Sequence, residues 1–179
     1  RSEPCSIPAS AMISYDDIVK AGSNIGGWEG KRGFYAVERY YEMAEKLRVQ
    51  GYEKMQAGDD RNALIMLLKF AKLFEEIQKQ PKLDKSSAGF KKVGRDMLTA
   101  MGHMEELKPK VQRELGMHTA AAAAVSIDRL SITDPGTLGL LGTGHQSVFQ
   151  LEAALRVRSF DEVMIWNRSG RELQKHLAM

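Results

Sequence analysis

The stretch DRNALIMLLKFAKLFEEIQK, residues 60–79, decides the fold of the first part of the chain. Its apolar residues recur at intervals of three and four, which places them along one face of an α-helix. The predicted inner face consists of Ala63, Leu64, Leu67, Leu68, Ala71, Phe74 and Ile77. A helix with so wide an apolar face has to be covered by other elements, so we expect further helices beside it.

Two more long amphipathic helices are expected, one on each side of this stretch. The first begins near Phe34 and ends before Gly58, after which the acidic pair at 59–60 starts the next helix. The second follows the break at Pro81, and its apolar residues fall in steps of three and four over 90–115; Pro109 is expected to kink it or end it early. The pattern predicts a three-helix bundle over residues 32–116.

Residues 1–31 are expected to form a loose N-terminal segment with a short helix over residues 16–21. A glycine-rich loop spans residues 22–33, and Trp28 is its predicted anchor. The acid pair Glu75–Glu76 is adjacent in sequence, so its side chains diverge on the predicted helix, and both are expected in solvent.

Composition limits the classes of protein. The 179 residues carry a formal net charge of +3, too little to argue for nucleic-acid binding. The single cysteine, Cys5, excludes an internal disulfide framework and fits a reducing, cytoplasmic location. No apolar run reaches the roughly 18 residues that a membrane span needs. Because the chain opens with Arg1, we expect it to be a fragment of a longer protein.

Methionines recur along the third predicted helix at Met97, Met101 and Met104. One interpretation is that they belong to the core. The other is that they form an adaptable surface that accepts the amphipathic helix of a partner. No histidine, cysteine or carboxylate in residues 32–116 has the spacing of a metal site or a nucleophile, so no catalytic and no metal-binding residues are predicted there.

A family pattern covers this helical part. It is carried by RGFY (32–35), QAGDD (56–60), NALIMLLKF (62–70), FKKV (90–93) and ELKPK (106–110). These stretches resemble the helical N-terminal domain of the STAM-binding protein (AMSH) family, which UBPY-type ubiquitin-specific proteases share. The resemblance implies an MIT-like adaptor or dimerisation domain at endosomes that engages an ESCRT-type protein. The zinc or cysteine protease domain of those enzymes has no counterpart in this sequence.

Residues 117–179 have a different pattern. The apolar run at 137–141 is typical of a buried strand, a helical pattern begins at Gln146, and a second apolar run follows at 163–166. Gly142 and Gly144 lie between the first strand and the helix. This order predicts a truncated Rossmann-type βαβ unit in which the glycine turn and the helix N-terminus bind a pyrophosphate.

The end of the second strand bears on the choice of cofactor. An NAD-binding unit would place an acid there, whereas this chain has Asn167-Arg168-Ser169. An arginine at this position suits the 2′-phosphate of NADP, so NADP(H) is the predicted cofactor. The alternative is a glycine-rich turn that binds no ligand.

The stretches TAA (119–121), LGLLGTGHQS (138–147) and FDEVMIWNRS (160–169) resemble the ornithine cyclodeaminase/mu-crystallin family. The resemblance implies that NADP(H) is held by Thr119, Gly142, Thr143, Gly144, His145, Gln146, Asn167, Arg168 and Ser169. His118 stands where that family has a substrate-binding arginine. It is either a substitute ligand or an ordinary surface histidine.

Two functions follow from these patterns. The favoured one is a non-catalytic adaptor, cytoplasmic and endosome-associated, that binds a partner helix or a second copy of itself. The alternative is an NADP(H)-binding oxidoreductase-like protein of the ornithine cyclodeaminase/mu-crystallin family. The second pattern begins abruptly near Thr119, so we also expect a junction there between two unrelated coding segments.

Overall fold

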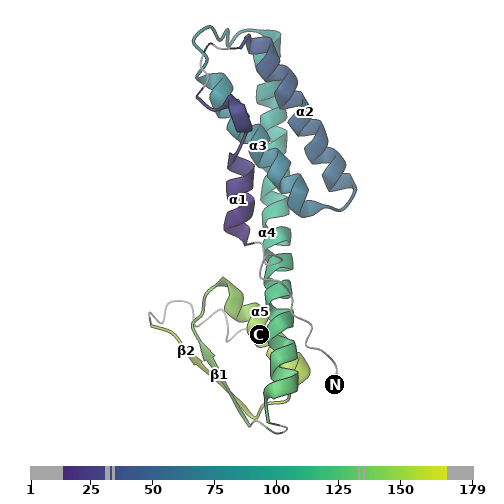
Figure 1. Cartoon of the computed structure of the whole chain (residues 1–179), viewed down its shortest axis with the longest axis vertical. Helices are drawn as coiled ribbons and strands as arrows, with labels where there is room; N and C mark the ends of the chain where they lie inside the picture. The colour runs from purple at the N-terminus through teal and green to yellow at the C-terminus, as the bar shows by residue number, and fades with distance from the viewer. Residues whose placement is uncertain (1–13, 31–32, 34, 133, 135, 169–179) are drawn as a thin grey trace. The chain divides into compact units, whose positions relative to one another are not determined.

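The computed structural model describes residues 14–30, 33, 35–132, 134 and 136–168. The chain divides into two compact units, Arg1–Gln112 and Arg113–Met179. The first contains α1 (Tyr15–Ser23), the 3-10 turn η2 (Gly26–Trp28), α2 (Val37–Gln56), α3 (Asp60–Gln78) and the first part of α4 (Ala88–Leu130). The second contains the rest of α4, β1 (Thr137–Leu141), α5 (His145–Val157) and β2 (Glu162–Trp166) (Figure 1). The predicted mainly helical class is confirmed.

The core of the first unit is built on α3. Its fully buried residues are Ala63, Leu64, Leu67, Phe70, Leu73 and Ile77. The prediction is right for four of them, while Leu68, Ala71 and Phe74 are only half-buried. Phe70 and Leu73 were missed because α1 and α2 both pack on α3, so its buried face is wider than a single stripe.

Two glycines let neighbouring helices approach α3 closely. A Cβ atom at Gly22 of α1 would lie 2.5 Å from the Cβ atom of Leu68. A Cβ atom at Gly51 of α2 would lie 2.8 Å from the Cδ2 atom of Leu67. Since Ile18 is also buried, α1 is a packed part of the first unit. Residues 1–13 of the predicted N-terminal segment lie outside the described residues.

The glycine-rich loop is held by contacts between aromatic rings and by hydrogen bonds from two of its backbone amides. The ring of Trp28 lies 4.9 Å from that of Tyr40, which confirms Trp28 as the anchor. The Gly30 amide donates to Glu76 Oε2 at 3.3 Å, and the Gly33 amide donates to Gln80 Oε1 at 2.9 Å. The prediction that Glu76 is solvated is therefore wrong, because this buried carboxylate accepts hydrogen bonds from the loop and from Lys79.

Charged groups connect α2 to α4. The Arg48 guanidinium donates to Glu45 at 2.6 Å and lies 3.6 Å from the Asp96 carboxylate of α4. The hydrogen bond from Arg48 holds the pKa of Glu45 below its ordinary value, against the opposing effect of burial. Lys92 of α4 lies 3.5 Å from the same Glu45 carboxylate. These pairs join the two helices at their surface.

Pro109 is predicted from the sequence either to kink the third helix or to end it early. The helix does not end there, because α4 runs without interruption for 43 residues. Pro109 is exposed, while Leu107 and Val111 on either side of it are buried. Their packing offsets the cost of the missing amide donor. The alanine-rich stretch at 120–124 then continues the helix, since alanine has the highest helix propensity.

The second unit contains a parallel βαβ arrangement, as the sequence predicts. β1 pairs with β2 in a register that sets Leu141 opposite Trp166, and α5 connects them. Leu151 and Ala154 of α5 are buried. A Cβ atom at Gly116 of α4 would overlap the ring of Phe149, so α4 and α5 are in close contact within this unit.

Replacing Glu76 by glutamine tests the loop anchor. The hydrogen bond from Lys79 and that from the Gly30 amide hold the pKa of Glu76 below its ordinary value, against the opposing effect of burial. A depressed folded-state pKa gives stability above the unfolded-state pKa of about 4.3, which is lost as the pH falls through the folded-state pKa. Glu76→Gln should therefore lower the free energy of unfolding by about 1–3 kcal/mol at neutral pH, and by less in acid.

The control for that experiment is Glu75→Gln, because Glu75 is exposed and pairs only with the neighbouring Lys72 among its described contacts. Urea unfolding of both variants from pH 3 to 7 measures the difference. Equal losses for the two variants, or a loss at Glu76 that does not shrink in acid, would contradict the anchoring role.

Candidate functional site

The glycine turn after β1 and the Asn167-Arg168 stretch after β2 lie at the same edge of the sheet, at the carboxyl ends of the parallel strands. Gly142 follows β1 and Asn167 follows β2, and the strand register brings both to the same edge. The Gly142 amide donates to the Trp166 carbonyl at 2.7 Å. The Asn167 side-chain amide donates to the hydroxyl of Thr143, which is buried. The structure thus joins two of the predicted residues, Asn167 and Thr143, through a direct hydrogen bond, and it ties Gly142 to the last residue of β2.

The glycine turn leads into the N-terminus of α5. Gly142 has a φ of +91°, a backbone conformation that glycine adopts without strain. Gly144 is the N-cap residue of α5, and because glycine has no side chain, no side chain caps this helix N-terminus. A Cβ atom at either glycine would have no atom within 4 Å, so the backbone is open to approach. His145 and Gln146 lie exposed in the first turn of α5.

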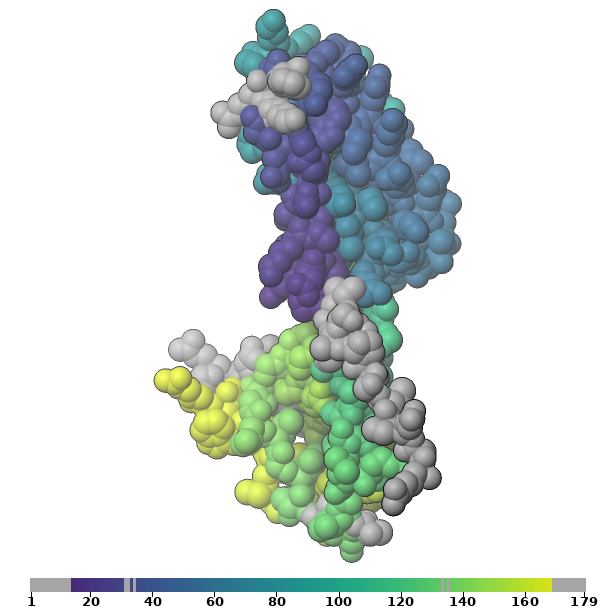
Figure 2. All heavy atoms as spheres, viewed as in Figure 1, coloured from purple at the N-terminus to yellow at the C-terminus, as the bar shows by residue number. Residues whose placement is uncertain are grey.

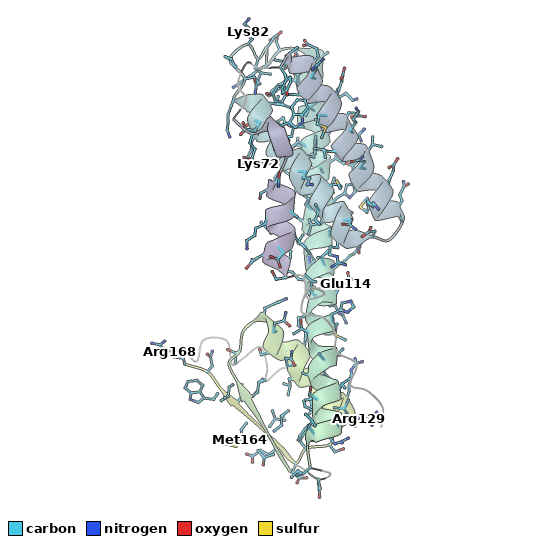
Figure 3. All side chains as sticks on the ribbon, in the orientation of Figure 1. Lys72, Lys82, Glu114, Arg129, Met164 and Arg168 are labelled. Atoms are coloured by element: carbon cyan, nitrogen blue, oxygen red, sulfur yellow. The ribbon has the colours of Figure 1, made fainter. Side chains whose placement is uncertain are left out.

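This turn fits the phosphate-binding role predicted for it. A helix N-terminus carries a partial positive charge and amide donors that suit an anion. Arg168 is exposed directly after Asn167 and is labelled in Figure 3. Ser169, the last residue predicted for the site, lies outside the described residues.

Thr119 and His118 lie on α4 rather than on the turn. The Thr119 hydroxyl donates to the Leu115 carbonyl at 3.1 Å, so it serves the helix itself. Thr119 lies three residues after Gly116, and Gly116 faces Phe149 of α5. The His118 side chain is 77% exposed and lies 3.7 Å from Glu114, which favours the interpretation as a surface histidine.

The methionine surface is only partly as predicted. Met104 is 6% exposed, which favours the interpretation that it belongs to the core. Met97 is half-buried, and Met101 is 50% exposed. The largest exposed apolar side chain beside them is Leu98, at 71%. The sequence prediction missed Leu98 because it falls outside the three-and-four spacing of the core residues.

An ion pair that the sequence did not predict supports the second unit. Arg158, just after α5, donates to the Asp128 carboxylate of α4 at 2.7 Å and also to the Asp128 carbonyl. Over the described part of the chain there is no group of three or more histidine, cysteine or acidic residues placed to hold a metal. None of the helices in that part has the length and apolar character to cross a membrane.

The geometry defines a packed helical unit followed by a parallel βαβ unit with an open glycine turn. Residues 29–116 match the family model of the USP8 dimerisation domain, and residues 115–179 match that of the ornithine cyclodeaminase/mu-crystallin family. Both resemblances predicted from the sequence are confirmed.

One curated relative extends this comparison. The iminosuccinate reductase of Paracoccus denitrificans (strain Pd 1222) is 33% identical over 122 residues, covering 63% of this chain and 33% of the reductase. The chain therefore spans about a third of the length of that relative. No solved structure gives a significant match.

Replacing Thr143 by valine tests the link between the two motifs. Loss of the hydroxyl that accepts from Asn167 should destabilise the second unit by about 1 kcal/mol. Trp166 fluorescence in urea reports this unit, in a Trp28→Phe background that removes the only other tryptophan. Thr143→Ser keeps the hydroxyl and should be nearly neutral. An equal free energy of unfolding for the two variants would show that this hydrogen bond does not stabilise the second unit.

Proposed function

We propose that the first unit is a non-catalytic dimerisation and adaptor module. The observation that carries this proposal is the match of residues 29–116 to a dimerisation domain. The matched stretch coincides with helices α2, α3 and the first part of α4, whose core is densely buried. A preformed helical surface binds a partner with little loss of conformational freedom, which favours association through its exposed faces.

The resemblance to the AMSH family extends this proposal to a partner and a place. An amphipathic helix of an ESCRT-type protein is the proposed partner, with the protein cytoplasmic and associated with endosomal membranes. The apolar side chains of Met97, Leu98 and Met101 could anchor such a helix, and a partner bound there would compete with a second copy of the chain for the same surface.

The dimer can be tested by the mass of the protein in solution. The full chain should sediment at twice the monomer mass of 20.0 kDa at micromolar concentration. Met164, labelled in Figure 3, provides a control on the exposed face of the two-stranded sheet. Met164→Lys should leave the dimer intact. A monomeric wild-type chain, or a dimer that Met164→Lys dissociates, would contradict the proposal.

A second candidate function is NADP(H) binding by the βαβ unit. It is favoured by the hydrogen bond between Asn167 and Thr143, which joins the two motifs beside the open glycine turn. The backbone amides around Gly144 would hold the pyrophosphate, and Arg168 would hold the 2′-phosphate. A bound nicotinamide nucleotide would supply hydride chemistry, whereas the residues named here only bind and orient it.

Nucleotide binding predicts a specific titration. In the Trp28→Phe background, NADPH should quench Trp166 fluorescence with saturation in the micromolar range, while NADH should bind poorly. Arg168→Ala should weaken NADPH binding at least tenfold and leave NADH binding unchanged, since only NADPH carries the 2′-phosphate. Absence of saturation at millimolar NADPH, or equal effects on both nucleotides, would remove this candidate.

A further inference from the structure

The outer face of α4 carries an apolar surface that the first unit does not cover. Leu98 is 71% exposed and Met101 is 50% exposed. Together with Met97 and with Phe74 of α3 they line a shallow apolar groove. Two basic residues, Lys91 and Arg95, border it. We call Lys91, Gly94, Leu98, Met101, Gly102 and Glu105 the outer stripe of α4.

Two glycines of the outer stripe are not explained by packing within the chain. A Cβ atom at Gly22, Gly51 or Gly89 would come within 3.0 Å of a neighbouring side chain, so each of these helical glycines has a reason in the first unit. A Cβ atom at Gly94 or Gly102 would meet nothing within 4 Å. Glycine inside a helix costs stability relative to alanine. A second backbone that approaches closely would account for both.

Apart from Met101, which would face Arg95 of a second copy, the residues of the outer stripe are placed symmetrically about Leu98. Gly94 and Gly102 lie four residues before and after it, and Lys91 and Glu105 lie seven residues before and after it. Seven residues are close to two helical turns, so these positions share one face. If a second α4 lies antiparallel with Leu98 at the two-fold axis, each glycine faces the other glycine, and each Lys91 faces a Glu105 of opposite charge.

We propose that the outer stripe is the contact through which two copies of this chain dimerise, with their α4 helices antiparallel and Leu98 at the axis. The inference rests on the proposed dimerisation and names the surface that performs it. Identical surfaces meet in a two-fold dimer, and such a contact requires this kind of self-complementarity. Lys91 and Glu105 are both exposed, and Glu105 pairs with Lys108 of its own helix, so pairing between copies would share or replace that contact.

The first test replaces the central apolar residue in the full chain. Leu98→Glu places two like charges at the axis and should raise the dimer dissociation constant about a hundredfold, as expected for a central hot spot. Val125→Glu is the matched control, because Val125 is also an exposed apolar residue of α4, at 62%. It should leave the dissociation constant unchanged. Sedimentation velocity measures both, and circular dichroism verifies that each variant is folded.

The second test uses charge reversal to examine the orientation. Lys91→Glu and Glu105→Lys each create two like-charge pairs across the axis, so each should weaken the dimer about tenfold. The double variant restores opposite charges between copies and should recover most of the wild-type affinity. The Glu105–Lys108 pair within the helix is lost in the double variant as well, so recovery reports only the contact between copies.

The outcomes separate this inference from the proposed function. A monomeric wild-type chain overturns both. A wild-type dimer that persists in Leu98→Glu, or that Val125→Glu dissociates equally, leaves dimerisation standing and overturns the outer stripe as its contact. A dimer that depends on Leu98 but shows no recovery in the double charge variant overturns the antiparallel arrangement.

Discussion

The burial of α3 is the constraint on which the helical unit depends. Its buried apolar residues face more than one neighbouring helix, so α1, α2 and α4 are arranged around it (Figures 1 and 2). Each fully buried leucine or phenylalanine contributes about 1.5–3 kcal/mol relative to an exposed one. The polar residues at the end of α3 extend this role, since Glu76 and Gln80 bind the loop that carries Trp28. Helices packed in this way leave only their outer faces for binding.

The βαβ unit is constructed differently, because only one face of its small sheet is covered. Along both strands exposed and half-buried residues alternate, and the exposed set includes Leu141, Met164 and Trp166. Two strands with one covering helix are marginal on their own. Contacts with α4, namely Gly116 against Phe149 and Asp128 with Arg158, therefore carry much of the stability. A ligand that binds only the folded unit would add to it by mass action.

The sequence predicted the elements whose signals are local. The three-and-four spacing identified α2 and α3, and the alternation of apolar runs with a glycine turn identified β1, α5 and β2. The prediction from sequence failed where contacts between residues far apart in the sequence determine the structure. Pro109 is tolerated because buried neighbours hold the helix on both sides, and Glu76 is buried because a loop 46 residues earlier needs an acceptor. Met104 is buried and Leu98 is exposed for the same reason: the orientation of α4 depends on where α2 and α3 lie.

These two constructions imply different physics of binding. In the helical unit the outer stripe of α4 belongs to a helix whose core packing needs no partner, so the proposed association would join preformed surfaces and depend on a few apolar anchors. In the βαβ unit the bond between Asn167 and Thr143 joins the glycine turn to the end of β2, and the small sheet is marginal on its own. On the proposal of nucleotide binding, part of the binding free energy would be consumed by ordering this unit. On the two proposals, association through α4 would join surfaces that are already formed, whereas nucleotide binding would also have to organise its own site.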